Sequence, residues 1–405
     1  MSRLEPTNEA SAMQKEISAI AEQGGGTTKV EQLIQQYCPD GVEFRKLEYC
    51  LNYEQPTKYI VKDTKYDDTY PTPVLTAGQT FILGYTNEKT GIYQASKEKP
   101  VIIFDDFTTG FHWVDFDFKV KSSAMKMLRP TCDDISFRYV YYAMSSIHFE
   151  PGTHTRHWIS IYSQFEIPVP PLPVQEEIVR ILDNFTELQA ELQAELQKRL
   201  QQYEYYRDKL LSFSDLSNWG GQEISVEWKK LGEMGVNLDR KRKPITAGKR
   251  EAGDIPYYGA SGIVDYVKGY LFDGDYLLVS EDGANLLTRT YPIAFSIHGK
   301  TWVNNHAHII EFKERTTRKY VEYYLNSIDL SPWISAGAQP KLTQDNLNRI
   351  TIPVPSIDER QKIVDILDRF DKLTNDITAG LPAEIEARCK QYEYYRDQLL
   401  TFKQK

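Results

Sequence analysis

The chain has 405 residues, of which 41% are hydrophobic, 26% charged and 12% aromatic, and its formal net charge is -9. This composition is typical of a globular protein with two or three domains, and it excludes a collagen-like, a coiled-coil-only or a wholly disordered chain. The acidic balance excludes a broad polycation that coats nucleic acid through charge alone, but it leaves room for a local basic surface.

The cysteines and the apolar runs restrict where the protein acts. Cys38, Cys50, Cys132 and Cys389 are scattered, with no Cys-x-x-Cys pair. This argues against a disulfide scaffold or a Cys-rich zinc site and predicts a reducing, cytoplasmic environment. No apolar run approaches the roughly 18 residues of a membrane span, and the first residues lack the apolar core of a signal peptide.

The first half is predicted to contain a mixed block followed by one long helix. Residues 1–40 form an N-terminal segment with three consecutive glycines and are expected to be partly flexible. In residues 41–170, short apolar runs between Gly and Asp clusters indicate strands, without the regular alternation of a parallel sheet. In residues 171–213, apolar side chains recur every three or four positions, which predicts a helix of about 55–60 Å over roughly 175–212.

The second half has the same order. Residues 214–225 read as a linker, residues 226–355 as a second mixed block, and residues 356–405 as a second long helix. Gly380-Leu381-Pro382 should kink or break this helix. A helix that carries an apolar seam along its length packs against another helix. We therefore expect the two helices to pair as an antiparallel coiled coil.

The two halves are copies of one another. IPVPPLPVQEEIVRIL at 167–182 recurs as IPVPSIDERQKIVDIL at 352–367, and QYEYYRDKLLSF at 202–213 recurs as QYEYYRDQLLTF at 391–402. Weaker matches join 41–49 to 225–233 and 137–147 to 318–328. The expected fold is thus α+β: two globular blocks separated by two long helices in a pseudo-twofold tandem repeat.

Charge separates the blocks from the helices. Residues 41–166 have a net charge of -2 and residues 226–351 a net charge of +2, so the rest of the chain has -9. Six cations gather at Arg240–Lys243, Lys249 and Arg250. A loop of this kind is a candidate for contacts with phosphate, with a solvated loop as the alternative. The acidic helices are either solvated or dock a basic partner.

Three motifs resemble parts of active sites, and none is complete. Gly299-Lys300-Thr301 resembles the end of a phosphate loop, but Ala294 stands where a glycine is needed. Asp254-Ile255-Pro256-Tyr257 resembles the tetrapeptide with which amino-methyltransferases hold a base, but the Gly-rich loop for S-adenosylmethionine is missing. His306 and His308 have no third metal ligand nearby in the sequence. We expect neither catalytic residues, metal nor cofactor in this chain.

The repeat resembles a known family. The two junctions, the twin QYEYYRD endings, the loop Gly337-Ala338-Gln339-Pro340-Lys341-Leu342 and the opening CPDGVEFRKL at 38–47 are similar to the specificity (S) subunit of type I restriction–modification systems, over residues 29–405. The resemblance implies two target-recognition domains, each reading half of a bipartite site in the major groove of double-stranded DNA. The helices would then set the spacing between the half-sites.

The resemblance also implies partners. Two methyltransferase subunits would dock on the chain, and restriction/translocase subunits would join through them. S-adenosylmethionine, ATP and Mg²⁺ would belong to those partners. One departure stands out, because His154 and Arg156 replace Gln339 and Lys341 in the first copy of the loop. A different DNA contact is therefore expected there.

Candidate DNA-binding residues follow from base chemistry, in which Arg and Lys favour guanine while Asn and Gln favour adenine. In the second block they are Arg240, Lys241, Arg242, Lys243, Lys249, Arg250, Tyr258, Ser261, Asn285, Arg289, Lys300, Asn304, Asn305, Gln339 and Lys341. In the first block they are Lys58, Lys62, Lys65, Tyr85, Lys89, Tyr93, Lys97, His154, Arg156 and His157. Surface solvation is the alternative for each.

Candidate partner-docking residues lie at the helix ends. They are Tyr203, Tyr205, Tyr206, Arg207, Tyr392, Tyr394, Tyr395 and Arg396. The alternative is that these tyrosines only seal the coil. For the whole chain, the alternatives are a structural coiled-coil adaptor, a degenerate specificity subunit without DNA selectivity, or a methyltransferase that uses Asp254–Tyr257.

Overall fold

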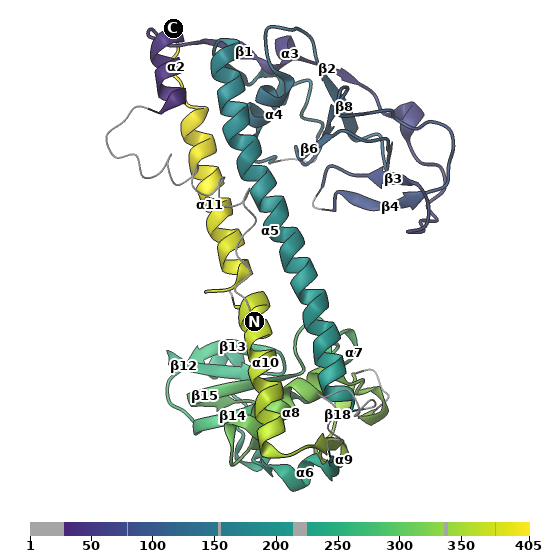
Figure 1. Cartoon of the computed structure of the whole chain (residues 1–405), viewed down its shortest axis with the longest axis vertical. Helices are drawn as coiled ribbons and strands as arrows, with labels where there is room; N and C mark the ends of the chain where they lie inside the picture. The colour runs from purple at the N-terminus through teal and green to yellow at the C-terminus, as the bar shows by residue number, and fades with distance from the viewer. Residues whose placement is uncertain (1–27, 79, 153–154, 214–224, 336–338, 377) are drawn as a thin grey trace. The chain divides into compact units, whose positions relative to one another are not determined.

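The computed structural model describes residues 28–405 except 79, 153–154, 214–224, 336–338 and 377. The chain divides into two compact units (Figure 1), of which unit 1 comprises Met1–Leu192 with Ile385–Lys405, and unit 2 comprises Gln193–Glu384. Each unit thus contains sequence from both copies of the repeat. Residues 1–27 of the segment 1–40 that is predicted to be partly flexible, and residues 214–224 of the predicted linker 214–225, fall outside the described residues.

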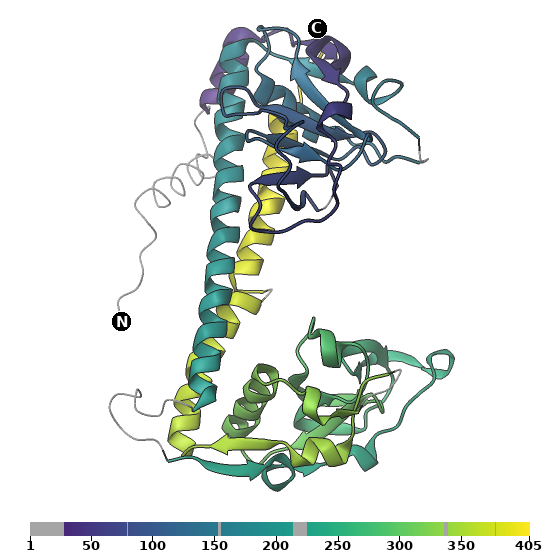
Figure 2. The same cartoon turned by 90° about the vertical axis from the view of Figure 1, so that its right-hand side faces the viewer.

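Unit 1 is built on a four-stranded antiparallel sheet. Its strand order is β2-β8-β5-β6, and a separate three-stranded sheet has the order β4-β3-β7. Figure 2 shows the chain from a second side. The elements are α2 (Lys29–Tyr37), β1 (Glu43–Lys46), α3 (Leu47–Cys50), β2 (Leu51–Glu54), β3 (Thr72–Leu75), β4 (Ile82–Thr86), β5 (Val101–Asp105), β6 (Phe111–Val114), β7 (Lys119–Val120), β8 (Met125–Pro130), α4 (Phe137–Ser145) and β9 (Glu166–Val169). β5 is central and buried on both faces, so its run of Val, Ile and Phe lacks polar alternation.

Unit 2 is built on a six-stranded sheet with the order β11-β16-β14-β15-β12-β13. Its elements are β10 (Glu227–Lys230), α6 (Leu231–Met234), β11 (Val236–Asn237), β12 (Ala252–Gly259), β13 (Gly262–Val267), β14 (Phe272–Ser280), α7 (Asn285–Thr288), β15 (Ala294–Val303), β16 (Ala307–Glu311), α8 (Arg315–Ser327), β17 (Ile334–Ser335), β18 (Lys341–Leu342), α9 (Gln344–Arg349) and β19 (Thr351–Val354). The α+β prediction is confirmed for both units.

The two units share a core and differ around it. The order β2-β8-β5-β6 of unit 1 recurs as β11-β16-β14-β15 in unit 2. In unit 1 the short β1 pairs with β9, and in unit 2 β10 pairs with β19 in the same antiparallel way. Unit 2 extends its sheet by β12 and β13, whereas unit 1 carries the separate sheet of β3, β4 and β7. The divergence of the two blocks therefore concentrates outside a common framework.

The long helices follow the prediction closely. α5 (Leu172–Ser212) is one continuous helix of 41 residues. The second copy is broken into α10 (Ile357–Asn375) and α11 (Leu381–Leu399), as Gly380-Leu381-Pro382 predicts. α10 begins with a capping box in which the Ser356 hydroxyl accepts from the Glu359 N–H. No helix in the described part of the chain is both long and apolar enough to cross a membrane.

Aromatic contacts pair the helices within each unit. In unit 1, Phe185 of α5 packs against Tyr392 and Tyr395 of α11, with ring centroids 6.4 and 5.6 Å apart. In unit 2, Phe370 of α10 packs against Tyr203 and Tyr206 of α5, at 6.3 and 5.7 Å. Each phenylalanine thus meets tyrosines of the other repeat copy. The antiparallel pairing is confirmed inside both units.

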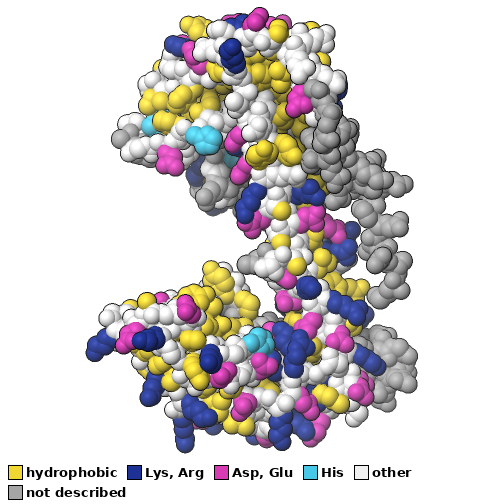
Figure 3. Space-filling view, turned by 90° about the vertical axis from the view of Figure 1, so that its left-hand side faces the viewer, with side chains coloured by type: hydrophobic (Ala, Val, Ile, Leu, Met, Phe, Trp, Pro, Cys, Tyr) yellow, Lys and Arg dark blue, Asp and Glu magenta, His cyan; other side chains and the backbone are white. Residues whose placement is uncertain are grey.

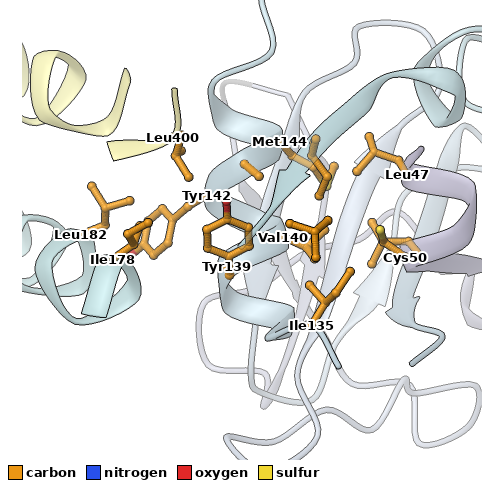
Figure 4. Packing of buried hydrophobic residues seen from close by; sticks show 14 of the residues in the cluster. Leu47, Cys50, Ile135, Tyr139, Val140, Tyr142, Met144, Ile178, Leu182 and Leu400 are labelled. Atoms are coloured by element: carbon orange, nitrogen blue, oxygen red, sulfur yellow. The ribbon is translucent and has the colours of Figure 1, made fainter. Parts of the chain in front are cut away.

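The core of unit 1 joins its sheet to its helices (Figure 4). Tyr139 and Tyr142 of α4 lie beside Ile178 and Leu182 of α5, with Leu400 completing the cluster. The chain end adds backbone contacts, because the Val42 N–H donates to the Lys403 carbonyl at 2.8 Å. Residues from the end of the second repeat are therefore part of the folded unit 1.

Phe185→Ala should destabilise unit 1 by about 3 kcal/mol or more, since truncating a buried phenylalanine leaves a cavity between two helices. Phe185 is only 1% exposed. Hydrogen exchange should speed up in α4 and α11 while the sheet of unit 2 stays protected. The control Tyr394→Ala removes a ring that is 61% exposed and should change little. Equal loss of protection in both units would contradict this packing.

Candidate DNA interface

A buried carboxylate at the end of β14 organises the site of unit 2. The Glu281 carboxylate accepts from Arg242 Nη1 at 2.7 Å and lies 3.1 Å from Lys341 Nζ. The Glu281 carbonyl also accepts from the Leu342 N–H at 2.8 Å. The loop before the second junction, which carries Gln339 and Lys341, is thus attached to the central sheet.

A second buried pair supports Glu281. His308 Nδ1 lies 2.6 Å from Asp239 Oδ2, and His308 Nε2 lies 2.7 Å from the Leu342 carbonyl. Both ring nitrogens of His308 thus face oxygen atoms of the fold. Burial acts to raise the pKa of Asp239, but the hydrogen bond and charge of His308 outweigh burial and hold that pKa below its ordinary value. The pKa of Glu281 is likewise lowered, by Arg242, His308 and Lys341 against the effect of burial.

Unit 1 contains the same arrangement with different chemistry. Asp106 directly follows β5, and its carboxylate lies 3.0 Å from Lys126 Nζ and 3.7 Å from Arg156 Nη1. The Asp106 carbonyl accepts from the His157 N–H at 2.8 Å, and its carboxylate accepts from the Trp158 N–H. The strand register places Lys126 opposite Phe104, as it places His308 opposite Val279. Both units therefore anchor the loop before the junction on an acid that ends a central strand.

The carboxylates of Asp239 and Glu281 form ion pairs with Arg242 of the protein itself. Within the described residues, Asp239, Glu281 and His308 lie close enough together to hold a metal ion. However, Arg242 already lies 3.3 Å from Asp239 and 2.7 Å from Glu281. A metal ion would have to displace this guanidinium, so the group does not fit a metal centre.

Most of the predicted cations of unit 2 reach the surface. Lys and Arg side chains are spread over the face of unit 2 that Figure 3 shows, with hydrophobic side chains among them. The loop of residues 240–250 lies on the sheet. Trp302 Nε1 donates to the Lys243 carbonyl, and the Ile245 N–H donates to the Tyr257 hydroxyl. The exposed candidates are Arg240, Lys241, Lys243, Lys249, Ser261, Lys300, Asn305, Gln339 and Lys341.

Several candidates in unit 2 serve the fold instead. Arg242 is 12% exposed and is held by Asp239, Glu281 and the Ala307 carbonyl. Asn304 is 6% exposed, and its amide oxygen accepts from the His306 N–H. Asn285 bonds to the backbone of Tyr291 through both ends of its amide.

Three further candidates are partly buried. Arg289 donates to the last carbonyls of α8, and Arg250 pairs with Asp265. Tyr258 packs against Phe295. The local sequence gave no sign of these long-range partners, which lie up to 37 residues away in the chain.

The candidates of unit 1 divide in the same way. Lys62, Lys65, Lys89, Lys97 and Arg156 are exposed, Lys58 is exposed and pairs with Glu54, and Tyr85 is half-buried on β4. Tyr93 is buried with its hydroxyl 2.6 Å from Arg129 Nε, and the His157 side chain is buried too. A DNA contact by Tyr93 or His157 stays a prediction. His154 lies outside the described residues.

The tyrosines of the two QYEYYRD motifs differ in burial according to their position in the motif. Tyr203, Tyr206, Tyr392 and Tyr395 pack on Phe370 or Phe185, which supports the alternative that they seal the helix pairs. The middle tyrosines, Tyr205 and Tyr394, are 60% and 61% exposed. Arg207 and Arg396 lie over Tyr203 and Tyr392. Only the middle tyrosines present most of their rings for docking.

The sequence predicts no anchoring role for Asp106 and Glu281, which stand out there only as members of the carboxylate pairs Asp105-Asp106 and Glu281-Asp282. A signal was present, since each is an acid that directly follows an apolar, strand-like run in its block. Their cationic partners Lys126 and Arg242 come from distant positions, so the pairing itself could not be inferred.

Comparisons with known proteins identify the family. Residues 39–202 and 224–387 each match the model of the type I restriction modification DNA specificity domain. The chain therefore belongs to the type I restriction–modification specificity family and carries two copies of its domain.

One curated relative matches this chain over nearly its whole length, and another matches over less than half. The chain is 45% identical over 395 residues to the EcoR124I/EcoR124II specificity subunit of Escherichia coli, covering 89% of this chain and 94% of that protein. It is 39% identical over 180 residues to a putative type I specificity subunit of Haemophilus influenzae, covering 44% and 46%.

Solved structures agree in fold. The S subunit of a type I system from M. genitalium matches with a TM-score of 0.60 at 16% identity, covering 89% of this chain and 97% of that one. A chain from a study of the assembly and conformational transition of a type I system matches with a TM-score of 0.51, covering 89% and 98%.

Asp239→Asn should lower the stability of unit 2 at pH 7, since it removes the carboxylate that faces His308. The lowered pKa of Asp239 contributes stability above about pH 4, its unfolded value, and this contribution is lost as the pH falls through the folded pKa. The variant should therefore lose less stability than the wild type between pH 5 and 3 in urea unfolding. Asp254→Asn, at an exposed position, is the control, and parallel pH curves for wild type and Asp239→Asn would contradict the assignment.

Proposed function

We propose that this chain is the non-catalytic subunit that gives a type I restriction–modification complex its DNA sequence specificity. Residues 41–170 and 226–355 are the two target-recognition domains, and each reads half of a bipartite site in the major groove of double-stranded DNA. The observation that supports this proposal is that the two units share one four-stranded order but differ in the strands added to it. Two different half-sites require a constant scaffold and variable base-reading side chains.

The helices 171–213 and 356–405 set the distance between the half-sites and dock two methyltransferase subunits. Tyr205 and Tyr394 support this role, because they are equivalent, exposed aromatic side chains on the two repeat copies. Restriction/translocase subunits join through the methyltransferases. S-adenosylmethionine, ATP and Mg²⁺ bind to those partners, and the complex acts on DNA in the cytoplasm.

The map of methylated adenines in a genome tests the function directly. Cells that express this gene with its methyltransferase should show a methylated motif in two parts with a fixed, unspecified gap, because two domains read two half-sites. Cells that express the methyltransferase alone should lack the motif. Absence of any gene-dependent motif would instead favour the structural adaptor or a degenerate specificity subunit.

The exposed cations should supply binding that depends on salt but not on sequence. Arg240→Ala, Lys243→Ala and Lys249→Ala together should reduce the slope of log K against log salt by about 2 to 3, since each phosphate contact contributes roughly 0.9. Fluorescence anisotropy of the assembled complex between 50 and 300 mM salt, a range spanning weak and strong screening, measures this slope.

The matched control is Lys313→Ala, which removes an exposed cation shortly after β16 ends at Glu311. Its slope should equal that of the wild type. An unchanged slope in the triple variant would remove these residues from the DNA interface.

A further inference from the structure

The hairpin of β12 and β13 exposes apolar side chains at the edge of the sheet in unit 2. Ile263, Val264 and Tyr266 are 47%, 54% and 53% exposed, and Tyr270 just beyond them is 48% exposed. β13 is the last strand of the sheet order. Proteins usually protect such an edge with charged residues or proline, and an exposed apolar cluster marks an interface.

The basic loop of unit 2 lies on the same hairpin. Lys243 and Ile245 are bound through their backbone to Trp302 and Tyr257. Arg250 Nη1 lies 3.0 Å from Asp265 Oδ2 of β13. Lys300 Nζ lies 4.9 Å from the centre of the Tyr270 ring. Exposed cations therefore flank the apolar residues.

The hairpin tip is fixed to the strand end that holds the junction loop. The Ser280 hydroxyl donates to the Ala260 carbonyl at the tip, and the next residue, Glu281, binds the loop of Gln339 and Lys341. Gly262 has φ of +126° and closes the turn opposite Gly259. The hairpin tip and the strand of Lys341 and Leu342 are thus both attached to the buried end of β14.

The charge of this surface indicates its occupant. Residues 240–270 contain seven Lys or Arg and only three Asp or Glu, in a chain whose net charge is -9. One of the three acids, Asp265, is already paired with Arg250. A polyanion therefore fits this surface better than an acidic or neutral protein face does.

We propose that the β12–β13 hairpin is the base-reading element of unit 2. A two-stranded ribbon fits the major groove, which is about 12 Å wide. Ile263, Val264 and Tyr266 contact the apolar edges of the bases, with thymine methyl groups as the natural partners. Lys243, Lys249 and Lys300 bind the phosphates beside the groove. This assignment rests on the proposed function and specifies which element carries it.

The test compares a triple variant with a double control variant in the complex with methyltransferase. Ile263→Ala, Val264→Ala and Tyr266→Ala together should relax one half-site of the methylated motif, with at least about a tenfold loss of discrimination at the affected base pairs. The other half-site and the gap should not change. The control Leu287→Ala with Tyr291→Ala removes side chains of unit 2 that are 56% and 60% exposed and should leave both half-sites intact.

Val264→Thr provides a second variant that preserves shape and folding, and it should shift the preference at one base pair. Loss of complex assembly by a folded triple variant would assign the hairpin to a protein partner and overturn the proposal. An unchanged methylated motif in the triple variant and in Val264→Thr would also overturn the proposal, while leaving the proposed function in place. If the wild-type complex itself produces no two-part motif, the proposed function fails, and the base-reading hairpin fails with it.

Discussion

Two tyrosine hydroxyls in each unit fix the point at which a recognition block meets its long helix. Tyr139 donates to the Pro168 carbonyl and Tyr142 to the Asp183 carboxylate. In unit 2, Tyr320 donates to the Pro353 carbonyl and Tyr323 to the Asp368 carboxylate. A tyrosine has a fixed reach and its buried hydroxyl needs a partner, so these bonds hold the helix at one distance from the sheet. Both copies of the repeat thus keep the same bonds, with Asp183 and Asp368 directly after the two junctions.

The helices are constrained by each other as well as by their blocks. Phe185 must fit Tyr392 and Tyr395, and Phe370 must fit Tyr203 and Tyr206. Each phenylalanine contacts tyrosines of the other repeat copy. A substitution in a helix of one copy therefore changes the packing of a helix of the other copy. The break between α10 and α11 fits this scheme, since α10 belongs to unit 2 and nearly all of α11 to unit 1. The helices of the two repeat copies therefore depend on each other for their packing.

The sequence predicts the features that depend on local pattern. The helical periodicity, the break at Gly380-Leu381-Pro382 and the repeat are all visible without coordinates. The sequence does not distinguish Arg242 from the neighbouring cations, because the partner that buries it is Glu281, 39 residues away. The sequence likewise does not predict that His157 and Asn304 are buried, because residues far away in the chain provide their contacts. The sheet order, and with it the edge position of β13, is also a long-range property.

The distribution of charge gives unit 2 a local surface that favours anions. The acidic excess lies outside the two blocks 41–166 and 226–351, while the cations of unit 2 gather around β12, β13 and the anchored loop. An anion is attracted to this surface more strongly than to α5, in which eight Asp or Glu stand against five Lys or Arg. The carboxylates of Glu281 and Asp106 are buried against the cations that they hold, so they do not weaken this attraction. A chain with a net charge of -9 can in this way carry a local basic surface.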